Sequence, residues 1–333
     1  MNRKLLNLAV ILAVCSSHVV AQTRTRITAV APNGLLAQLP ESDAVAQVKL
    51  RQLLSEAMPR ILAASPTRLA EVNASIESFK TRTGLDPRMF EQVAVGARFS
   101  YPSEGMTKVQ TVVLANGAFS PAAMIAAGRV ASNGAYREEK YQGKTIYIFK
   151  LDENIRLLGL FDFRIAELAA APLDEKVIAL GNVAAVHSLI DASRARKNAN
   201  AELIALASRD PNAVIGFGAN VTEKLIRNLD IGNAPIATDL ATLRQVYGSV
   251  GTTPTDLDVF LAARATDASA AKSLGDTLEG LKQFGALLVG RLSGAKGVLA
   301  KSALANMKIV TAANELQIRT AVPQADLGSL MGN

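Results

Sequence analysis

Apolar and polar residues alternate along several short stretches of the first half of the chain, and this alternation predicts strands. Turn residues separate neighbouring stretches, first at 102–105 and later at Gln142 and Gly143. Because such short turns join antiparallel strands, a mostly antiparallel sheet is expected. The predicted strands of this half cover residues 91–100, 108–118, 135–141, 144–150, 164–170 and 177–181.

A different spacing, with apolar residues three or four positions apart, predicts helices between these strands. Ser120 followed by Pro121 is a typical helix start, and Asn182 is a second N-cap candidate. The predicted helices of the first half cover residues 50–62, about 66–81, 121–130 and 183–194.

The second half repeats this order, beginning at the stretch 209–220 (RDPNAVIGFGAN), which is predicted to open with a strand. A helix is expected at 221–229 after Asn220, and a last strand pair at 307–322. The pattern indicates an internal duplication, in which residues 44–45, 91–95 and 111–119 correspond to 213–214, 244–248 and 258–266.

We therefore predict an α+β fold made of two similar units of mostly antiparallel sheet, with helices packed on one face. The first unit covers residues 22–197 and the second covers residues 198–333, with a polar linker at 197–200. Independent folding of the two units is the first expectation. The alternative is one continuous sheet, with residues 214–217 paired to a strand of the first unit and any ligand groove at the seam between the halves.

Residues 268–304 form the longest helical pattern, with an apolar stripe and glycines at positions 275, 280, 285 and 290. Since each glycine weakens a helix, a break is expected near Ser293 and Gly294. The stripe is interpreted mainly as core under the second sheet, and alternatively as a lid over an apolar groove or a partner surface. Its residues are Leu274, Leu278, Leu281, Phe284, Leu288 and Leu292, with Leu287 widening it.

The N-terminus has the pattern of a secretory signal peptide. Arg3 and Lys4 precede the apolar run 5–15, and Val19 and Ala21 fit a signal-peptidase site. Cleavage after Ala21 would make the protein exported, either periplasmic or secreted. The apolar run is too short to span a bilayer, so no transmembrane segment is expected in the mature chain.

Composition narrows the chemistry that is available to the chain. The net charge is +7, and lysine and arginine are spread among acids, so a nucleic-acid stripe is not expected. The single cysteine, Cys15, would leave with the signal peptide, which excludes disulfides in the mature protein. No cofactor and no metal site are expected.

Candidate catalytic residues are few. His187 is the only histidine of the mature chain, and its neighbour Ser188 would point about 100° away on a helix, so the two cannot pair. Residues 216–218 (GFG) resemble part of a dinucleotide loop, but Val221 replaces the third glycine, and a tight strand-to-helix turn is preferred. Asp256 and Asp258 are interpreted as solvated strand positions. We therefore expect no enzyme activity.

Four features stand out in the order of elements, namely the pairs Leu39-Pro40 and Ala44-Val45, a linker helix at 201–208 and the segment 210–214. With these features, the chain resembles a family of uncharacterised bacterial envelope proteins with duplicated α+β halves. The resemblance implies an envelope location and no established activity. The expected function is a non-catalytic binding or structural component of the cell envelope, with an unknown envelope protein as partner. A periplasmic carrier of a lipid or other hydrophobic ligand is the alternative.

Overall fold

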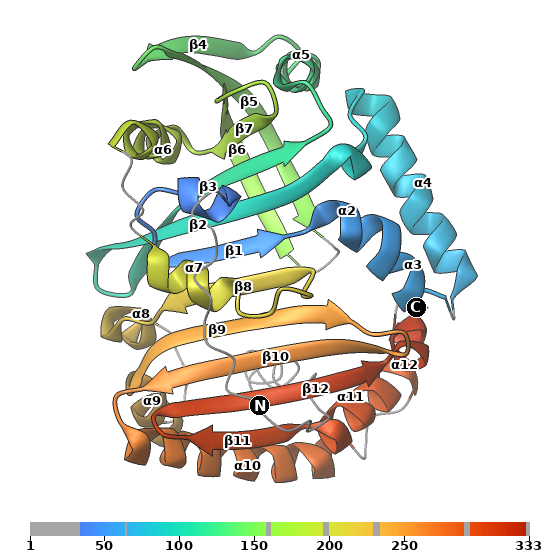
Figure 1. Cartoon of the computed structure of the whole chain (residues 1–333), viewed down its shortest axis with the longest axis vertical. Coiled ribbons are helices and arrows are strands. Elements are labelled where there is room, and N and C mark those ends of the chain that lie inside the picture. Colours follow the sequence, from blue (N-terminus) through green and yellow to red (C-terminus); the bar gives the residue numbers. More distant parts are fainter. Residues whose placement is uncertain are drawn as a thin grey trace.

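The computed structural model describes residues 34–63, 65–157, 161–195, 200–228, 234–289 and 294–330. The predicted signal peptide and residues 197–199 of the predicted linker lie outside these ranges. One large sheet runs along the molecule, with helices packed against it (Figure 1). The predicted α+β class and the antiparallel sheet are confirmed, because each strand pairing in the described residues is antiparallel.

The sheet has 12 strands in the order β11-β12-β10-β9-β8-β1-β2-β3-β7-β6-β5-β4. Most of the predicted strands are present, and several are longer than the alternation indicated. Their bounds are β1 Ala44–Val48, β2 Phe90–Ser103, β3 Met106–Gly117, β4 Tyr136–Tyr141, β5 Lys144–Leu157, β6 Phe161–Pro172, β7 Val177–Gly181, β8 Ile215–Asn220, β9 Leu243–Thr252, β10 Asp256–Ala265, β11 Lys308–Ala312 and β12 Glu315–Pro323.

The helices of the first half also follow the prediction. The segment expected as one helix at 50–62 is divided into α2 (Leu50–Gln52), a π-helical turn at Leu53–Ala57 and α3 (Met58–Ile61). Short 3-10 turns occur at Leu35–Gln38 and Pro87–Met89. The remaining helices are α4 Pro66–Thr83, α5 Pro121–Ala131, α6 Val183–Ala195, α7 Ala201–Ala207, α8 Glu223–Arg227, α9 Ala234–Ala241, α10 Ala268–Val289, α11 Gly294–Asn306 and α12 Gln324–Leu330.

The two halves meet where β1 pairs with β8 in the middle of the sheet (Figure 1). Ala46 lies opposite Phe217, and the pairing is extended by hydrogen bonds from the Lys49 amide to the Val214 carbonyl and from the Asn220 amide to the Asp43 carbonyl. The sheet is therefore continuous across the predicted unit boundary, which is the alternative arrangement considered above. On each side of this seam the next strands follow in chain order, β2 and β3 or β9 and β10, as a duplication predicts. The duplication itself stays a prediction.

Helices cover both faces of the sheet in the first half, and not one face as expected. Ile146 and Ile148 of β5 lie in a core cluster with Leu189 of α6. Phe149 and the partly buried Tyr147 lie in another cluster with Ile125 of α5. Since successive strand residues point to opposite faces, the unbroken apolar run of β5 needs a cover on each side.

Residues 216–218 lie inside strand β8, so their interpretation as a strand-to-helix turn is wrong. Gly216 and Gly218 face α7, which crosses this strand closely. A Cβ atom at Gly218 would lie 2.9 Å from the Leu203 carbonyl oxygen, and one at Gly216 would clash with the Ala207 carbonyl oxygen. The glycines therefore allow a helix to approach the sheet backbone, which is a packing role.

The start of the second half also differs from the prediction. Residues 210–214 form a turn, in which the Asn212 amide donates to the Asp210 carboxylate, and the strand begins only at Ile215. The next helix begins at Glu223 and not at Val221, because Thr222 is the N-cap and accepts a hydrogen bond from the Leu225 amide. Helices α9 and α12 were not predicted.

Asn200, predicted to be part of a polar linker, is buried. Its side chain bridges to the loop before β1, as the amide of Ser42 donates to Asn200 Oδ1 and Asn200 Nδ2 donates to the Pro40 carbonyl. The polar character of Asn200 therefore reflects a hydrogen-bonded contact between the two halves and not exposure to solvent.

Candidate functional site

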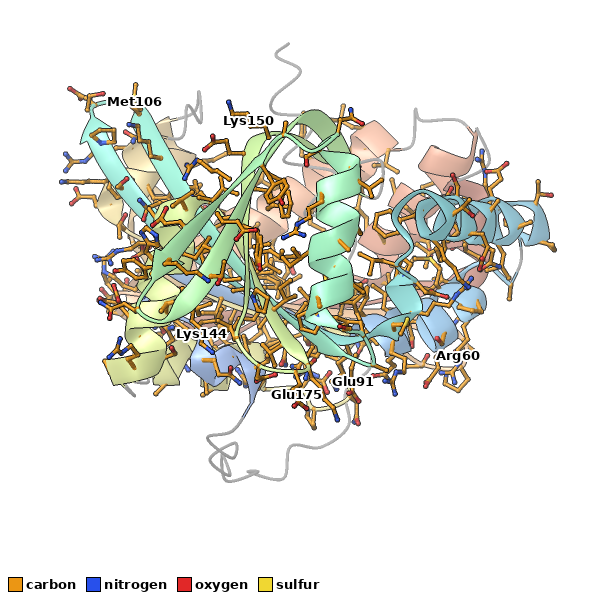
Figure 2. All side chains as sticks on the ribbon, turned by 90° about the horizontal axis from the view of Figure 1, so that it is seen from above. Arg60, Glu91, Met106, Lys144, Lys150 and Glu175 are labelled. Atoms are coloured by element: carbon orange, nitrogen blue, oxygen red, sulfur yellow. The ribbon has the colours of Figure 1, made fainter. Side chains whose placement is uncertain are left out.

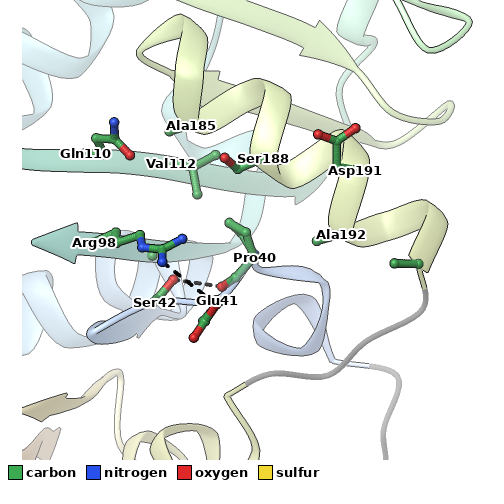
Figure 3. Close-up of a pocket in the computed structure, with 12 residues that line it drawn as sticks. Pro40, Glu41, Ser42, Arg98, Gln110, Val112, Ala185, Ser188, Asp191 and Ala192 are labelled. Carbon is green, nitrogen blue, oxygen red and sulfur yellow. Dashed lines mark hydrogen bonds and ion pairs between the residues drawn. The ribbon is translucent and has the colours of Figure 1, made fainter.

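A cavity of about 330 Å³ lies beside the seam, between α6 and the first strands (Figure 3). Its floor is made by Gly96 and Val112, and Ala185 and Ala192 contribute from α6. Small side chains on the facing side of this helix leave the space open. At the rim, Arg98 and Glu41 form an exposed ion pair with an N–O distance of 4.0 Å.

A second, smaller cavity of about 200 Å³ shares Glu41, Ser42 and Arg98 with the first and crosses the seam to Glu202 and Asn220. Its lining is mostly polar and carries both signs of charge. Both cavities are rimmed by polar groups that partly neutralise one another. Only the smaller cavity crosses the seam, whereas the larger one, which we call the seam cavity, lies beside it and is lined by residues of the first half alone.

His187 lies on α6 close to these cavities but does not line either of them. Its ring stacks on Tyr141 with a centroid separation of 4.0 Å, and its Nε2 atom lies 2.7 Å from Glu139 Oε1. The Ser188 hydroxyl donates to the Ala184 carbonyl at 3.0 Å, so it is turned toward its own helix. His187 thus meets a carboxylate and an aromatic ring, and the adjacent serine does not join them.

The hydroxyl of Tyr141 continues this cluster, because it donates a hydrogen bond of 2.9 Å to Asp191 Oδ2. This hydrogen bond raises the pKa of Tyr141 above its ordinary value. A phenol with a raised pKa is a poor general base, and the group acts here as a link between β4 and α6.

Another charged cluster covers the face of β9, β10 and β12 near Tyr247. This buried side chain accepts a hydrogen bond from Arg209, and Glu315 forms ion pairs with Arg209 at 3.3 Å and Arg264 at 3.2 Å. Burial raises the pKa of Tyr247 far above its ordinary value. Each charged group has an opposite partner, which is typical of a structural network.

Asp256 and Asp258, expected at solvated strand positions, lie two residues apart on β10. Asp258 as a whole residue is exposed. Partial burial of its carboxylate raises the pKa of Asp258, and the positive charge of Arg319 opposes this increase. Within the described ranges, no group of three or more histidine, cysteine or acidic side chains is arranged to hold a metal ion.

The apolar stripe of α10 divides into a buried and an exposed part. Leu274 is buried and Leu278 packs against two core clusters, as the core interpretation requires. The predicted break falls between Val289, where α10 ends, and Gly294, where α11 begins. Leu292 lies outside the described residues, and Leu288 is partly buried.

The C-terminal part of the stripe is exposed. The fractional exposure is 39% for Leu281, 60% for Phe284 and 73% for Leu287. These residues are spaced three apart, so they follow one another along one side of the helix. We call this set the α10 stripe. Val298 on α11 is also 51% exposed.

Helix α9 is bonded to the first half of α10. Asp239 of α9 accepts hydrogen bonds from Ser273 at 2.9 Å and from Thr277 at 2.5 Å. One helical turn later, polar Ser and Thr give way to Leu281 and Phe284 on the same side. The sequence pattern identified the apolar positions, but periodicity alone could not show which of them the fold leaves exposed.

No family model matches the chain, and no curated protein matches it. No helix in the described part of the chain is both long enough and apolar enough to cross a membrane. Among solved structures, the chain is similar to crystal form III of TP0453, with 10% identity, a TM-score of 0.42, and coverage of 90% of this chain and 98% of that one. It is also similar to crystal form IV of TP0453, with 11% identity, a TM-score of 0.43, and coverage of 90% and 96%.

Proposed function

We propose that this protein is an exported, non-catalytic component of the cell envelope that acts by surface contact through the α10 stripe. The observation that carries the proposal is the exposure of Leu281, Phe284 and Leu287 on consecutive turns of one helix. Single exposed apolar residues are common, but a contiguous apolar patch on a protein surface is typical of an interaction site.

The proposal of a non-catalytic role rests on the chemistry around the polar clusters. The ring of His187 stacks on Tyr141, its Nε2 atom lies near Glu139 without the geometry of a hydrogen bond, and the hydroxyl of Ser188 bonds to its own helix. A nucleophilic mechanism needs a base within hydrogen-bond reach of the nucleophile. The Tyr247 network likewise pairs its charges internally, and it leaves little chemistry for a substrate.

A carrier of a hydrophobic ligand is the second candidate, and the seam cavity is the observation that favours it. Its volume of about 330 Å³ is at the lower end of the range for small-molecule sites, and Gly96 and Val112 make its floor apolar. The charged rim of Glu41 and Arg98 does not suit a long acyl chain. We therefore place this candidate second.

The proposal is tested by fractionating producing cells and washing the envelope fraction. The double variant Phe284→Ser/Leu287→Ser should lose retention in the envelope, since it removes the apolar contact area. The matched control is Met106→Ser/Val109→Ser, which changes exposed apolar residues at the outer end of the β2–β3 hairpin, where Met106 projects (Figure 2). Equal retention of both variants would contradict the proposal.

The carrier alternative has a different readout. Native mass spectrometry of protein purified from its own envelope would show a bound lipid or other ligand. If a ligand stays bound to Phe284→Ser/Leu287→Ser but is lost from Ala192→Phe, which fills the seam cavity from a partly buried position of α6, the carrier function replaces the contact function.

A further inference from the structure

The part of the chain that contains the α10 stripe carries charges of one sign. Between Glu279 and Glu315 the chain has no acidic residue but has five cations, namely Lys282, Arg291, Lys296, Lys301 and Lys308. This segment of 35 residues, 280–314, therefore holds +5 of the net charge of +7. The rest of the chain has a net charge of +2, so this segment holds most of the net positive charge.

The described lysines of this segment differ in their availability. Lys282 donates to the Met307 carbonyl at 2.7 Å and is held near the start of β11. Lys301 on α11 and Lys308 on β11 are exposed. A cationic region and an exposed apolar stripe thus occur on consecutive elements, and α10 and α11 pack together where Leu304 contacts Gly285.

Glu279, just before the stripe, is ion-paired with Lys282 at 3.7 Å, and the next acid along the chain is Glu315. An exposed Phe and Leu stripe followed by exposed lysines is the pattern of helices that lie in the surface of an anionic bilayer. A protein partner would be expected to present acids of its own, and interfaces usually mix both signs of charge. A second copy would bring the exposed Lys301 and Lys308 against the same cations, which opposes self-association through this surface.

We propose that the α10 stripe and the lysines of α11 dock on the surface of an anionic phospholipid bilayer. The inference rests on the proposed function, because it names the partner of that same surface. Phe284 and Leu287 would enter the boundary between headgroups and acyl chains, and Lys301 would remain at the level of the phosphates. The chain would lie on the membrane and not span it.

The chain contains no tryptophan, so a single introduced tryptophan reports on one position. The variant Phe284→Trp should show a blue shift and reduced quenching by iodide when phosphatidylglycerol-containing vesicles are added. The control Val130→Trp replaces a residue of α5 that is 68% exposed, and its emission should not change. Vesicles of pure phosphatidylcholine should give a much smaller effect, and added salt should weaken the binding without abolishing it.

Cosedimentation with the same vesicles gives the energetic test. Loss of both apolar side chains in Phe284→Ser/Leu287→Ser should weaken partitioning by roughly a hundredfold. Lys301→Gln, which removes one cation, should weaken it about fivefold at low salt and little at high salt, since about 1 kcal/mol per cation near an anionic surface corresponds to that factor. Thermal melts of each variant show whether the fold is kept, and Phe284→Trp provides a readout that needs no loss of binding.

Absence of binding to anionic vesicles, or binding that ignores Phe284 and Lys301, would overturn the inference. If the vesicle experiments fail while Phe284 is required for retention in the envelope, the contact function stands and its partner is a protein. If retention in the envelope also ignores Phe284, the proposed function fails as well. Concentration-dependent dimerisation that is lost in Phe284→Ser would likewise replace the lipid surface by a second copy.

Discussion

Asn200 and Ser42 are 158 positions apart in the chain, yet the Ser42 amide donates a hydrogen bond of 3.0 Å to Asn200 Oδ1 inside the protein. The same side chain donates to the Pro40 carbonyl at 2.7 Å, so both of its polar atoms are satisfied. Asn200 therefore fixes the start of α7 to the loop that leads into β1, next to the seam.

Asn200→Ala should lower the free energy of unfolding by about 2 kcal/mol, because it leaves the buried Ser42 amide without its partner and removes one of the two donors to the Pro40 carbonyl, which keeps the Ser42 hydroxyl. Urea unfolding of the variant measures this loss. Gln283→Ala, at an exposed position of α10, is the control and should be close to neutral. A neutral effect of Asn200→Ala would show that the bridge does not stabilise the seam.

The continuous sheet predicts that the two halves do not fold independently. Cleavage between residues 196 and 199 should leave a nicked complex that melts in one cooperative transition, because β1 and β8 remain paired. Expressed separately, residues 22–197 and 198–333 would each expose a central strand edge and should not give a cooperative melt. Two independent transitions would restore the interpretation as separate folding units.

Two glycine substitutions distinguish the effect of close packing on stability from the effect of helix propensity. Gly216→Ala should be strongly destabilising, since its Cβ would clash with the Ala207 carbonyl oxygen of α7. Gly280→Ala, in α10, meets no atom within 4 Å and should stabilise the protein by about 1 kcal/mol through helix propensity. Thermal unfolding of the two variants should therefore shift in opposite directions. A stabilising Gly216→Ala would contradict the close approach of α7 to β8.

The environment of Glu315 predicts that the protein loses stability at acidic pH. Burial raises the pKa of this carboxyl, but hydrogen bonds from Tyr247, Gln317 and Arg264 outweigh it, so the folded pKa lies below the usual value. The resulting stability is present above the unfolded pKa of about 4.3 and is lost as the pH falls through the folded pKa. Glu315→Gln should flatten the dependence of unfolding free energy on acidic pH. Glu175→Gln, in an exposed turn, should leave it unchanged.

The sequence predicts local elements well where a single physical rule decides them. The alternation at 91–118 and the N-cap at Asn182 gave elements that the structure confirms, and the Asn182 side chain accepts a hydrogen bond from the Ala185 amide. Positions decided by distant contacts were interpreted wrongly. Gly216 resembles a turn glycine until α7 is placed above it, and Asn200 resembles a linker residue until Pro40 and Ser42 are placed beside it.

The α10 stripe was likewise predicted only in part from the sequence. Helical spacing predicted Leu274 and Phe284 as members of one apolar stripe, but only the first is buried. Which part of the stripe is buried depends on tertiary packing, and periodicity does not contain that information. The absence of acids between Glu279 and Glu315 is the sequence signal that distinguishes this part of the stripe from ordinary core.

The most direct test identifies the molecules that contact Phe284 in the envelope of intact cells. A photo-crosslinking amino acid at position 284 in producing cells should give adducts with an envelope component, and the same group at Val130, which is also exposed on a helix, should give none. Adducts to phospholipid would support the bilayer as the partner, and adducts to a protein would support contact without it. Equal crosslinking at 284 and 130, or none at 284, would contradict the claim that this protein acts through the α10 stripe.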